Sequence, residues 1–104
     1  MHAIMRYRIR TSDLDTHLAL LQAVYAELAD VQPAGLDWTT YQLDDPTSFL
    51  EVVSGPDLPE PLPHLTTFQR YRAGLEDRCD EPPVFTETRQ VGSYRSPCAD
   101  ATTD

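Results

Sequence analysis

The sequence contains no lysine, and its eight basic residues are all arginine, against seventeen acidic residues and a formal net charge of -9. A chain with this charge and no basic tract repels the phosphate backbone of nucleic acids and anionic lipid. No apolar run is long enough to span a membrane, and arginine interrupts the N-terminal MHAIMRYRIR where a signal peptide has an unbroken apolar segment. These absences argue against nucleic acid and membrane as partners and favour a cytoplasmic protein.

Cysteine is also scarce. Cys79 and Cys98 are the only two, and neither lies in a CxxC pair or in a Cys/His spacing typical of metal sites. Two cysteines suffice for one disulfide, but a pair of reduced thiols is the usual state inside the cell. We therefore expect free thiols and no metal site.

The composition that remains is that of a folded protein of 104 residues, with 40% hydrophobic and 24% charged residues. A chain of this length buries roughly two-thirds of the surface that its unfolded state exposes, which is enough for one core. We expect a single domain over residues 1–95. The last nine residues, SPCADATTD (96–104), are expected to form a flexible tail.

Periodicity predicts the elements of the first half. Residues 3–10 alternate between two faces, which indicates a strand. A helix is expected to start near Ser12 and to run to about residue 31, because large apolar residues follow at spacings of three and four: Leu14, Leu18, Leu21, Tyr25 and Leu28. The runs LDWTTYQL (36–43) and SFLEVV (48–53) are rich in strand-forming residues and flank the turn sequence DDPT, so they predict a hairpin.

The second half begins with four prolines between residues 54 and 64, a composition that favours polyproline II and a rigid loop. A second helix is expected from about Pro63 to Cys79, and a last strand over residues 84–95, after Pro82 and Pro83. The resulting order β-α-β-β-α-β is that of the ferredoxin-like α+β fold. Such a fold has a four-stranded antiparallel sheet with both helices on one face.

The element order and lengths, together with the segment HLTTF (64–68) at the start of the second helix, resemble the dimeric α/β-barrel family typified by the antibiotic biosynthesis monooxygenases. The resemblance covers residues 1–95 and includes no signature motif. It implies that two protomers press their uncovered sheet faces together and enclose a cavity. An exposed sheet face with aromatic residues on its strands also needs such cover. We therefore expect a homodimer that has room for a small-molecule ligand.

Charged residues on the strands provide the candidate site. If Met5, Tyr7 and Ile9 face the helices, Arg6 and Arg8 face the uncovered side of the sheet. The later strands are expected to add Glu51, Glu87 and Arg89 to that side. One interpretation is a salt-bridge network on the surface or at the dimer interface. The other is a polar pocket in which the arginines hold an anionic or enol-type substrate oxygen while a glutamate moves a proton.

Two more residues complete the candidate set. His64 is the histidine expected beside a cleft, although a lone histidine at a helix start is commonly just a partly buried polar residue. Trp38 and Tyr41 alternate on their strand, so at most one of them lines the cavity, and core packing is the alternative for either. The candidate catalytic residues are His64, Glu51 and Glu87. The candidate substrate-binding residues are Arg6, Arg8, Trp38 and Arg89.

The resemblance implies a cofactor-independent monooxygenase or related enzyme that acts on a small aromatic or polyketide-like molecule. In that chemistry the substrate supplies the electrons to oxygen, and the protein supplies deprotonation, orientation and a dry pocket. Haem-degrading members of the family need an asparagine on the first strand, and this sequence contains no asparagine. The alternative is a non-catalytic dimer that binds a small ligand or serves as an accessory module, because one fold hosts many unrelated roles.

Overall fold

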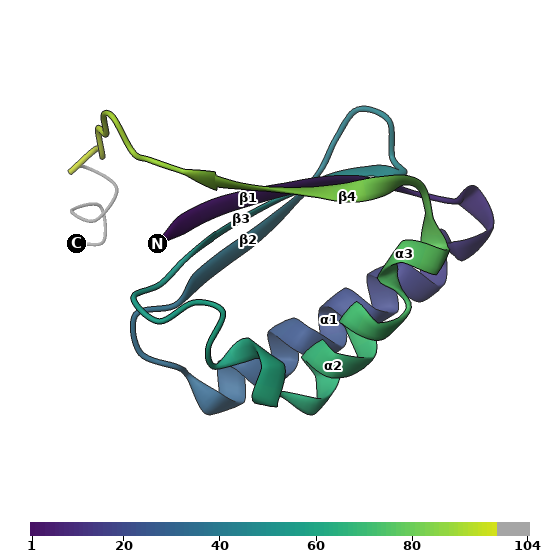
Figure 1. The fold of residues 1–104 in the computed structure, drawn as a ribbon, viewed down its shortest axis with the longest axis horizontal. Helices are drawn as coiled ribbons and strands as arrows, with labels where there is room; N and C mark the ends of the chain where they lie inside the picture. The colour runs from purple at the N-terminus through teal and green to yellow at the C-terminus, as the bar shows by residue number, and fades with distance from the viewer. Residues whose placement is uncertain (98–104) are drawn as a thin grey trace.

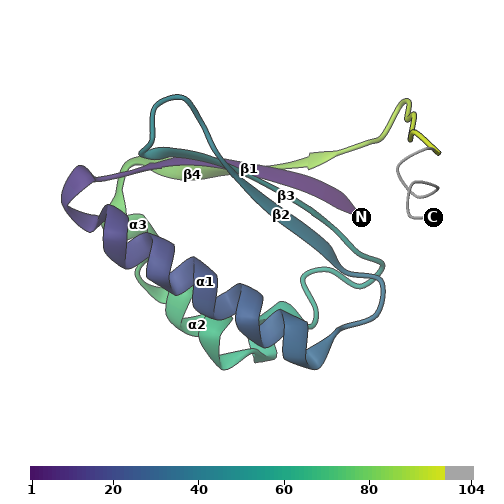
Figure 2. The same ribbon diagram turned by 180° about the vertical axis from the view of Figure 1, so that it is seen from behind.

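The computed structural model describes residues 1–97. Its elements are β1 (His2–Ile9), α1 (Leu14–Val31), β2 (Asp37–Gln42), β3 (Ser48–Ser54), α2 (Thr66–Ala73), α3 (Leu75–Arg78) and β4 (Cys79–Thr88), with the 3-10 turns η1 (Thr11–Asp13) and η2 (Leu62–His64). The strands form one antiparallel sheet in the order β2-β3-β1-β4. Helices α1 and α2 lie side by side against one face of this sheet (Figure 1 and Figure 2). The ferredoxin-like α+β fold predicted from the sequence is confirmed.

Strand pairing decides which side chains face the helices. Tyr7 lies opposite Phe49, and Met5 lies opposite Glu51, in the β1–β3 pair. Because directly paired residues share a face of the sheet, Glu51 faces the helices together with Met5 and Tyr7. The prediction that Glu51 faces the uncovered side was therefore wrong. The prediction relied on hydrophobic alternation, whereas β3 directs the charged Glu51 toward the helices and the apolar Leu50 and Val52 toward the open face.

Helix α1 spans nearly the range that the sequence predicted, but its buried stripe is shifted. Its buried residues are His17, Leu21 and Val24. The large apolar residues of the predicted stripe flank them and are partly buried: Leu14, Leu18, Tyr25 and Leu28. The helix ends where Gln32 adopts a left-handed conformation with φ 51°, and its backbone N–H donates to the carbonyl of Leu28 at 2.8 Å.

The predicted second helix is divided in two. Gly74 interrupts it with φ -109° and ψ 13°, which leaves α2 before the break and α3 after it. The interruption frees the carbonyl of Tyr71, which accepts a hydrogen bond of 2.8 Å from Nη2 of Arg78. Tyr71, before the break, and Leu75, after it, are both fully buried.

The proline-rich segment folds as consecutive turns and not as the expected polyproline II. The N–H of Glu60 donates to the carbonyl of Asp57 at 2.9 Å, and the N–H of Leu62 donates to that of Pro59 at 3.0 Å. These local hydrogen bonds satisfy the backbone, which polyproline II leaves to solvent. The turns also bring Leu62 into the interior.

Strand β4 starts earlier and ends earlier than predicted, and it includes Pro82 and Pro83. Proline removes a backbone donor and is tolerated mainly at sheet edges and irregularities. Both conditions hold, because β4 is an edge strand and its register with β1 shifts between Arg6 and Ile9. Within residues 1–97, no helix combines the length and apolar character needed to cross a membrane. Residues 98–104, which include Cys98 and most of the predicted tail, lie outside the described part.

Candidate active site

A cavity of about 400 Å³ lies between the sheet, α2 and the proline-rich loop. Its walls are mainly apolar: Met5 and Trp38 come from the sheet, Leu58 and Leu62 from the loop region, and Phe68 from α2. Its polar groups come from Glu51, Tyr71 and Arg72. An apolar pocket with a few placed polar groups is the usual form of a small-molecule site.

Glu51 is the buried acid of this cavity, with only 3% of its surface exposed. The hydroxyls of Tyr7 and Tyr71 donate to the same carboxyl oxygen, Oε2, at 2.7 and 2.5 Å. Burial raises the pKa of Glu51, and hydrogen bonds from Tyr71, Tyr7 and Trp38 together with the charge of Arg72 offset only part of this rise. A buried carboxyl with a raised pKa in a pocket wall is suited to accept or donate a proton.

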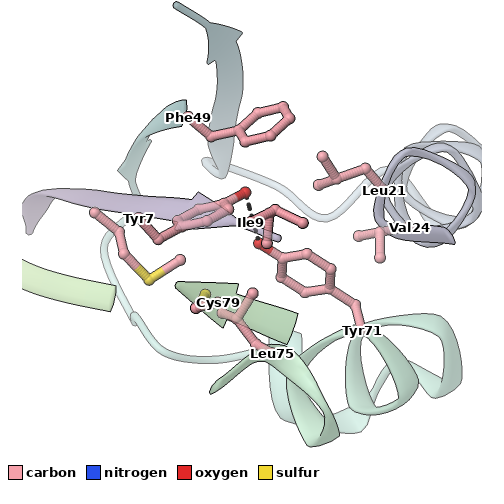
Figure 3. Packing of buried hydrophobic residues seen from close by; sticks show 9 residues of the cluster. Tyr7, Ile9, Leu21, Val24, Phe49, Tyr71, Leu75 and Cys79 are labelled. Atoms are coloured by element: carbon pink, nitrogen blue, oxygen red, sulfur yellow. Dashed lines mark hydrogen bonds between the residues drawn. The ribbon is translucent and has the colours of Figure 1, made fainter. Parts of the chain in front are cut away.

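The two tyrosines act as fixed donors to this carboxyl. Their rings come from β1 and α2 and point their hydroxyls toward one another (Figure 3), with 3.3 Å between the oxygens. Burial, and then the charge of Glu51, raise the pKa of both phenols far above the usual value. Both hydroxyls therefore keep their protons at neutral pH.

His17 extends the network toward α1. Its side chain is fully buried, and its Nε2 lies 2.9 Å from the hydroxyl oxygen of Tyr7. Burial, and then the nearby charge of Arg78, lower the pKa of His17 to about 4, so the ring is neutral at pH 7. Its Nδ1 is buried and has no hydrogen-bond partner among residues 1–97.

The structure brings two of the predicted site residues together, Trp38 and Glu51, which both line the cavity. The ring of Trp38 packs against those of Tyr25 and Phe68, with centroids 5.5 and 5.8 Å apart. Trp38 and Tyr41 lie on opposite faces of the sheet, as predicted, because Trp38 pairs with Val53 whereas Tyr41 pairs with Leu50.

The predicted Arg/Glu cluster does not form. Arg6 and Arg8 point to the open face, on the side of the sheet opposite Glu51. Arg8 forms an exposed salt bridge of 3.2 Å with Glu81. Glu87 pairs with Ala3, which places it on the helix side of the sheet but in an exposed position, and Arg89 follows β4 and is also exposed. The cavity therefore lies inside one chain and not on the face where the cluster was expected.

His64 also lies apart from the cavity. It belongs to η2, because α2 begins only at Thr66, and its side chain is 73% exposed. Its Nε2 lies 2.6 Å from Oε1 of Glu60. Among residues 1–97, no group of three or more His, Cys, Asp or Glu side chains is placed to hold a metal ion.

The sequence interpretation missed four residues of the site: Tyr7, His17, Tyr71 and Arg72. A signal for the tyrosines was present, because both occupy core-facing positions and a buried phenol needs a hydrogen-bond partner. His17 precedes Leu21 by four residues and Val24 by seven, which is the spacing of one helix face. Arg72 gave no such signal, because nothing in the sequence shows which helical arginine reaches the cavity.

Comparisons with known proteins bear on the fold. No protein-family model and no curated protein sequence matches the chain. A solved structure of an antibiotic biosynthesis monooxygenase superposes with a TM-score of 0.70 and 18% identity over 88% of this chain and 98% of that chain. One from Nitrosomonas europaea gives 0.69 and 15%, over 86% and 88%. L-rhamnose mutarotase from Formosa agariphila gives 0.55 and 9%, over 91% and 99%.

Identities this low establish the fold alone. The chain has the α+β fold of the antibiotic biosynthesis monooxygenases, as the order of its elements implied. The resemblance seen in the sequence is confirmed at that level.

Proposed function

We propose that this protein is a cofactor-independent monooxygenase, or a related enzyme, that acts on a small aromatic or polyketide-like molecule. The observation that carries the proposal is the buried carboxyl of Glu51, with its raised pKa, in the wall of a cavity whose other walls are aromatic and aliphatic. The shared fold with proteins named as monooxygenases supports it. The site is the cavity inside each chain.

The residues of the cavity have separate roles in the proposed reaction. A flat substrate lies against Trp38 and Phe68, and Glu51 removes an acidic proton from it. Arg72, the arginine of the cavity wall, stabilises the anion that remains. The anion then reacts with O₂: an activated CH₂ becomes C=O, its four electrons reduce O₂, one oxygen atom stays in the product and the other leaves as water. The walls exclude bulk water during this step.

The proposal includes a homodimer formed through the open face of the sheet. That face carries exposed apolar side chains from three strands, Tyr41, Val52 and Val84. Apolar side chains gathered on one sheet face favour burial against another surface. A second copy of the chain covers this face without any other component.

Oxygen uptake tests the enzymatic proposal. The protein is incubated aerobically with a panel of anthrone-like and quinol compounds, with heat-killed protein as the reference. Glu51→Gln keeps the shape of the side chain but removes the base, so we expect the rate to fall at least a hundredfold, the usual contribution of a general base. Glu87→Gln, which changes an exposed carboxyl outside the cavity, is the matched control and should keep the wild-type rate. Absence of uptake above the heat-killed reference would contradict the proposal.

The second candidate is a non-catalytic dimer that binds a small ligand. It is favoured by the hydrogen bonds of Glu51, whose Oε2 already accepts two phenol donors within the protein. In that case an aromatic compound binds in the cavity and is recovered unchanged. Substituting Arg72 by Gln then weakens binding of anionic compounds, whereas Arg70→Gln on the same helix, outside the cavity, does not.

A further inference from the structure

The hydroxyl of Tyr7 stands at the centre of a chain of hydrogen-bonding groups that the proposed reaction does not by itself explain. Its oxygen lies 2.7 Å from Oε2 of Glu51 and 2.9 Å from Nε2 of His17. A phenol carries one proton and can donate only one hydrogen bond. If Tyr7 donates to Glu51, the contact with His17 requires the proton to be on the imidazole nitrogen.

The surroundings of His17 favour that arrangement. The ring is neutral, so only one of its two nitrogens carries hydrogen. If the hydrogen were on Nδ1, a buried N–H would have no partner, and Tyr7 would have to donate to His17 and leave Glu51. With the hydrogen on Nε2, the ring donates to Tyr7, and the carboxylate keeps a charge-assisted hydrogen bond, which is the stronger kind.

We propose that His17 is a positioning residue: as the neutral Nε2–H tautomer it donates to the hydroxyl oxygen of Tyr7 and thereby directs the proton of Tyr7 toward Glu51. His17 is not among the residues that line the cavity, and it acts only through Tyr7. The inference rests on the proposed role of Glu51 as the base of the site, but its test does not require activity.

The geometry also accommodates the protonated state of Glu51. The oxygens of Glu51, Tyr7 and Tyr71 form a triangle whose third edge, between the two phenols, is 3.3 Å. When Glu51 is ionised, both phenols donate to it. When Glu51 takes up a proton it donates to Tyr7, Tyr7 turns its proton to Tyr71, and Tyr71 continues to donate to Glu51. In both states His17 donates to Tyr7, so proton uptake leaves no phenol in this triangle without an acceptor.

Other polar or charged groups near this centre come from each neighbouring element, and among them Cys79 of β4 acts on Tyr7. Those that act on Glu51 are Tyr7 of β1, Trp38 of β2, and Tyr71 and Arg72 of α2, and Glu51 in turn acts on Tyr25 of α1. Arg78, at the end of α3, acts on His17 and disfavours a second proton on its ring. None of them besides Tyr7 lies within hydrogen-bonding distance of His17 among the contacts of residues 1–97.

The tautomer is measured directly by NMR of ligand-free protein labelled with ¹⁵N at histidine. We expect His17 to show the Nε2–H pattern from pH 5.5 to pH 8. The exposed His2 and His64 provide reference signals in the same spectra. An Nδ1–H pattern, or a doubly protonated ring in this range, would overturn the proposal.

Substitutions then separate positioning from packing. The amide nitrogen of His17→Gln can replace the Nε2–H donor, whereas His17→Leu fills space without one. The acid constant of Glu51, followed by ¹³C NMR of its carboxyl group, should stay near wild type in the first variant. It should fall about threefold in the second, because the bond from Tyr7 loses the donor that polarises it. Equal values in wild type and both variants would overturn the proposal.

If His17→Leu fails to fold, the tautomer of His17 and the His17→Gln variant still test the proposal. A Glu51 acid constant in His17→Gln that differs from wild type would contradict the donor role. The outcomes remain distinct from failure of the proposed function. A protein that consumes no oxygen but shows the Nε2–H tautomer and the donor-dependent acid constant retains the positioning role and loses the enzymatic one. A protein that consumes oxygen but shows the Nδ1–H tautomer retains the enzymatic role and loses the positioning role.

Discussion

Burial of His17 makes the stability of the fold depend on pH. Its pKa is about 4 in the folded chain and 6.5 in the unfolded chain, so between these values the unfolded chain binds a proton that the folded chain does not. The contribution of His17 to the free energy of unfolding is therefore lost as the pH falls from 6.5 toward 4. Glu51 acts in the opposite sense, because its raised pKa lets the folded chain keep a proton at a pH at which the unfolded chain has lost it. The contribution of Glu51 to the free energy of unfolding is lost as the pH rises through its folded pKa.

The contribution of His17 can be isolated by comparing wild type with His17→Gln in urea denaturation between pH 4 and 7. We expect the wild-type free energy of unfolding to fall relative to the variant as the pH decreases, with a slope that approaches about 1.4 kcal/mol per pH unit, the value for one proton. His2→Gln removes an exposed imidazole that forms no salt bridge among residues 1–97, and it should keep the wild-type pH dependence. If the free energies of unfolding of wild type and His17→Gln changed in parallel with pH, the lowered pKa assigned to His17 would be contradicted.

The short helix α3 joins the cavity wall to the edge strand. It follows the interruption at Gly74 and leads directly into β4. Leu75 is fully buried in the core shared by the sheet and both long helices, close to Cys79 in Figure 3. The packing of one side chain thus holds the end of α2, which carries Tyr71 and Arg72, against the sheet.

Leu75→Ala should lower the free energy of unfolding by about 2–5 kcal/mol, because it removes buried methyl groups and leaves a cavity. Urea denaturation measures the change. Val91→Ala is the control, since Val91 is 88% exposed, and it should stay within about 0.5 kcal/mol of wild type. A loss below about 1 kcal/mol for Leu75→Ala would mean that the core around α3 relaxes freely.

Elements with strong local signals could be predicted from the sequence, and those that depend on distant pairing could not. The spacing of apolar residues placed α1 within two residues of its observed start, and Asp45-Pro46 placed the hairpin turn, where the carboxyl of Asp45 accepts bonds from Thr47 and Ser48. Strand β4 instead depends on pairing with β1, which extends it through two prolines. Local composition contains no information about that partner.

The candidate site was harder to predict for a related reason. Trp38 and Glu51 were identified by residue type, but Glu51 was assigned to the wrong face because an inward charge contradicts the hydrophobic alternation of β3. Functional sites are the places where such local rules are expected to fail. The partners of Glu51 come from β1 and α2, and only the folded arrangement brings Tyr7 and Tyr71 within reach of it.

The molecule as a whole has two unlike sheet faces. One is covered by α1 and α2 (Figure 1). The other carries Arg6 among apolar side chains that include Leu50 and Val52. The covered face holds the complete cavity within one chain. Dimerisation through the open face is thus separable from the chemistry of the cavity.

We expect wild type to have the mass of a dimer at micromolar concentration in size-exclusion chromatography with light scattering. Val52→Glu places a charge on the open face and should shift the protein to a monomer, because an unpaired charge is costly to bury in an interface. Val31→Glu, at an exposed position at the end of α1, should remain dimeric. A monomeric wild type would exclude this mode of assembly.

Trp38 is the sole tryptophan of the chain, and its indole forms part of the cavity wall. Its fluorescence therefore comes from one known place, in contact with the rings of Tyr25, Phe68 and Tyr71. A compound that enters the cavity changes the polarity around this indole or quenches it by stacking. The unlabelled protein thus contains its own optical sensor of occupancy, with which compound collections can be screened before any reaction is known.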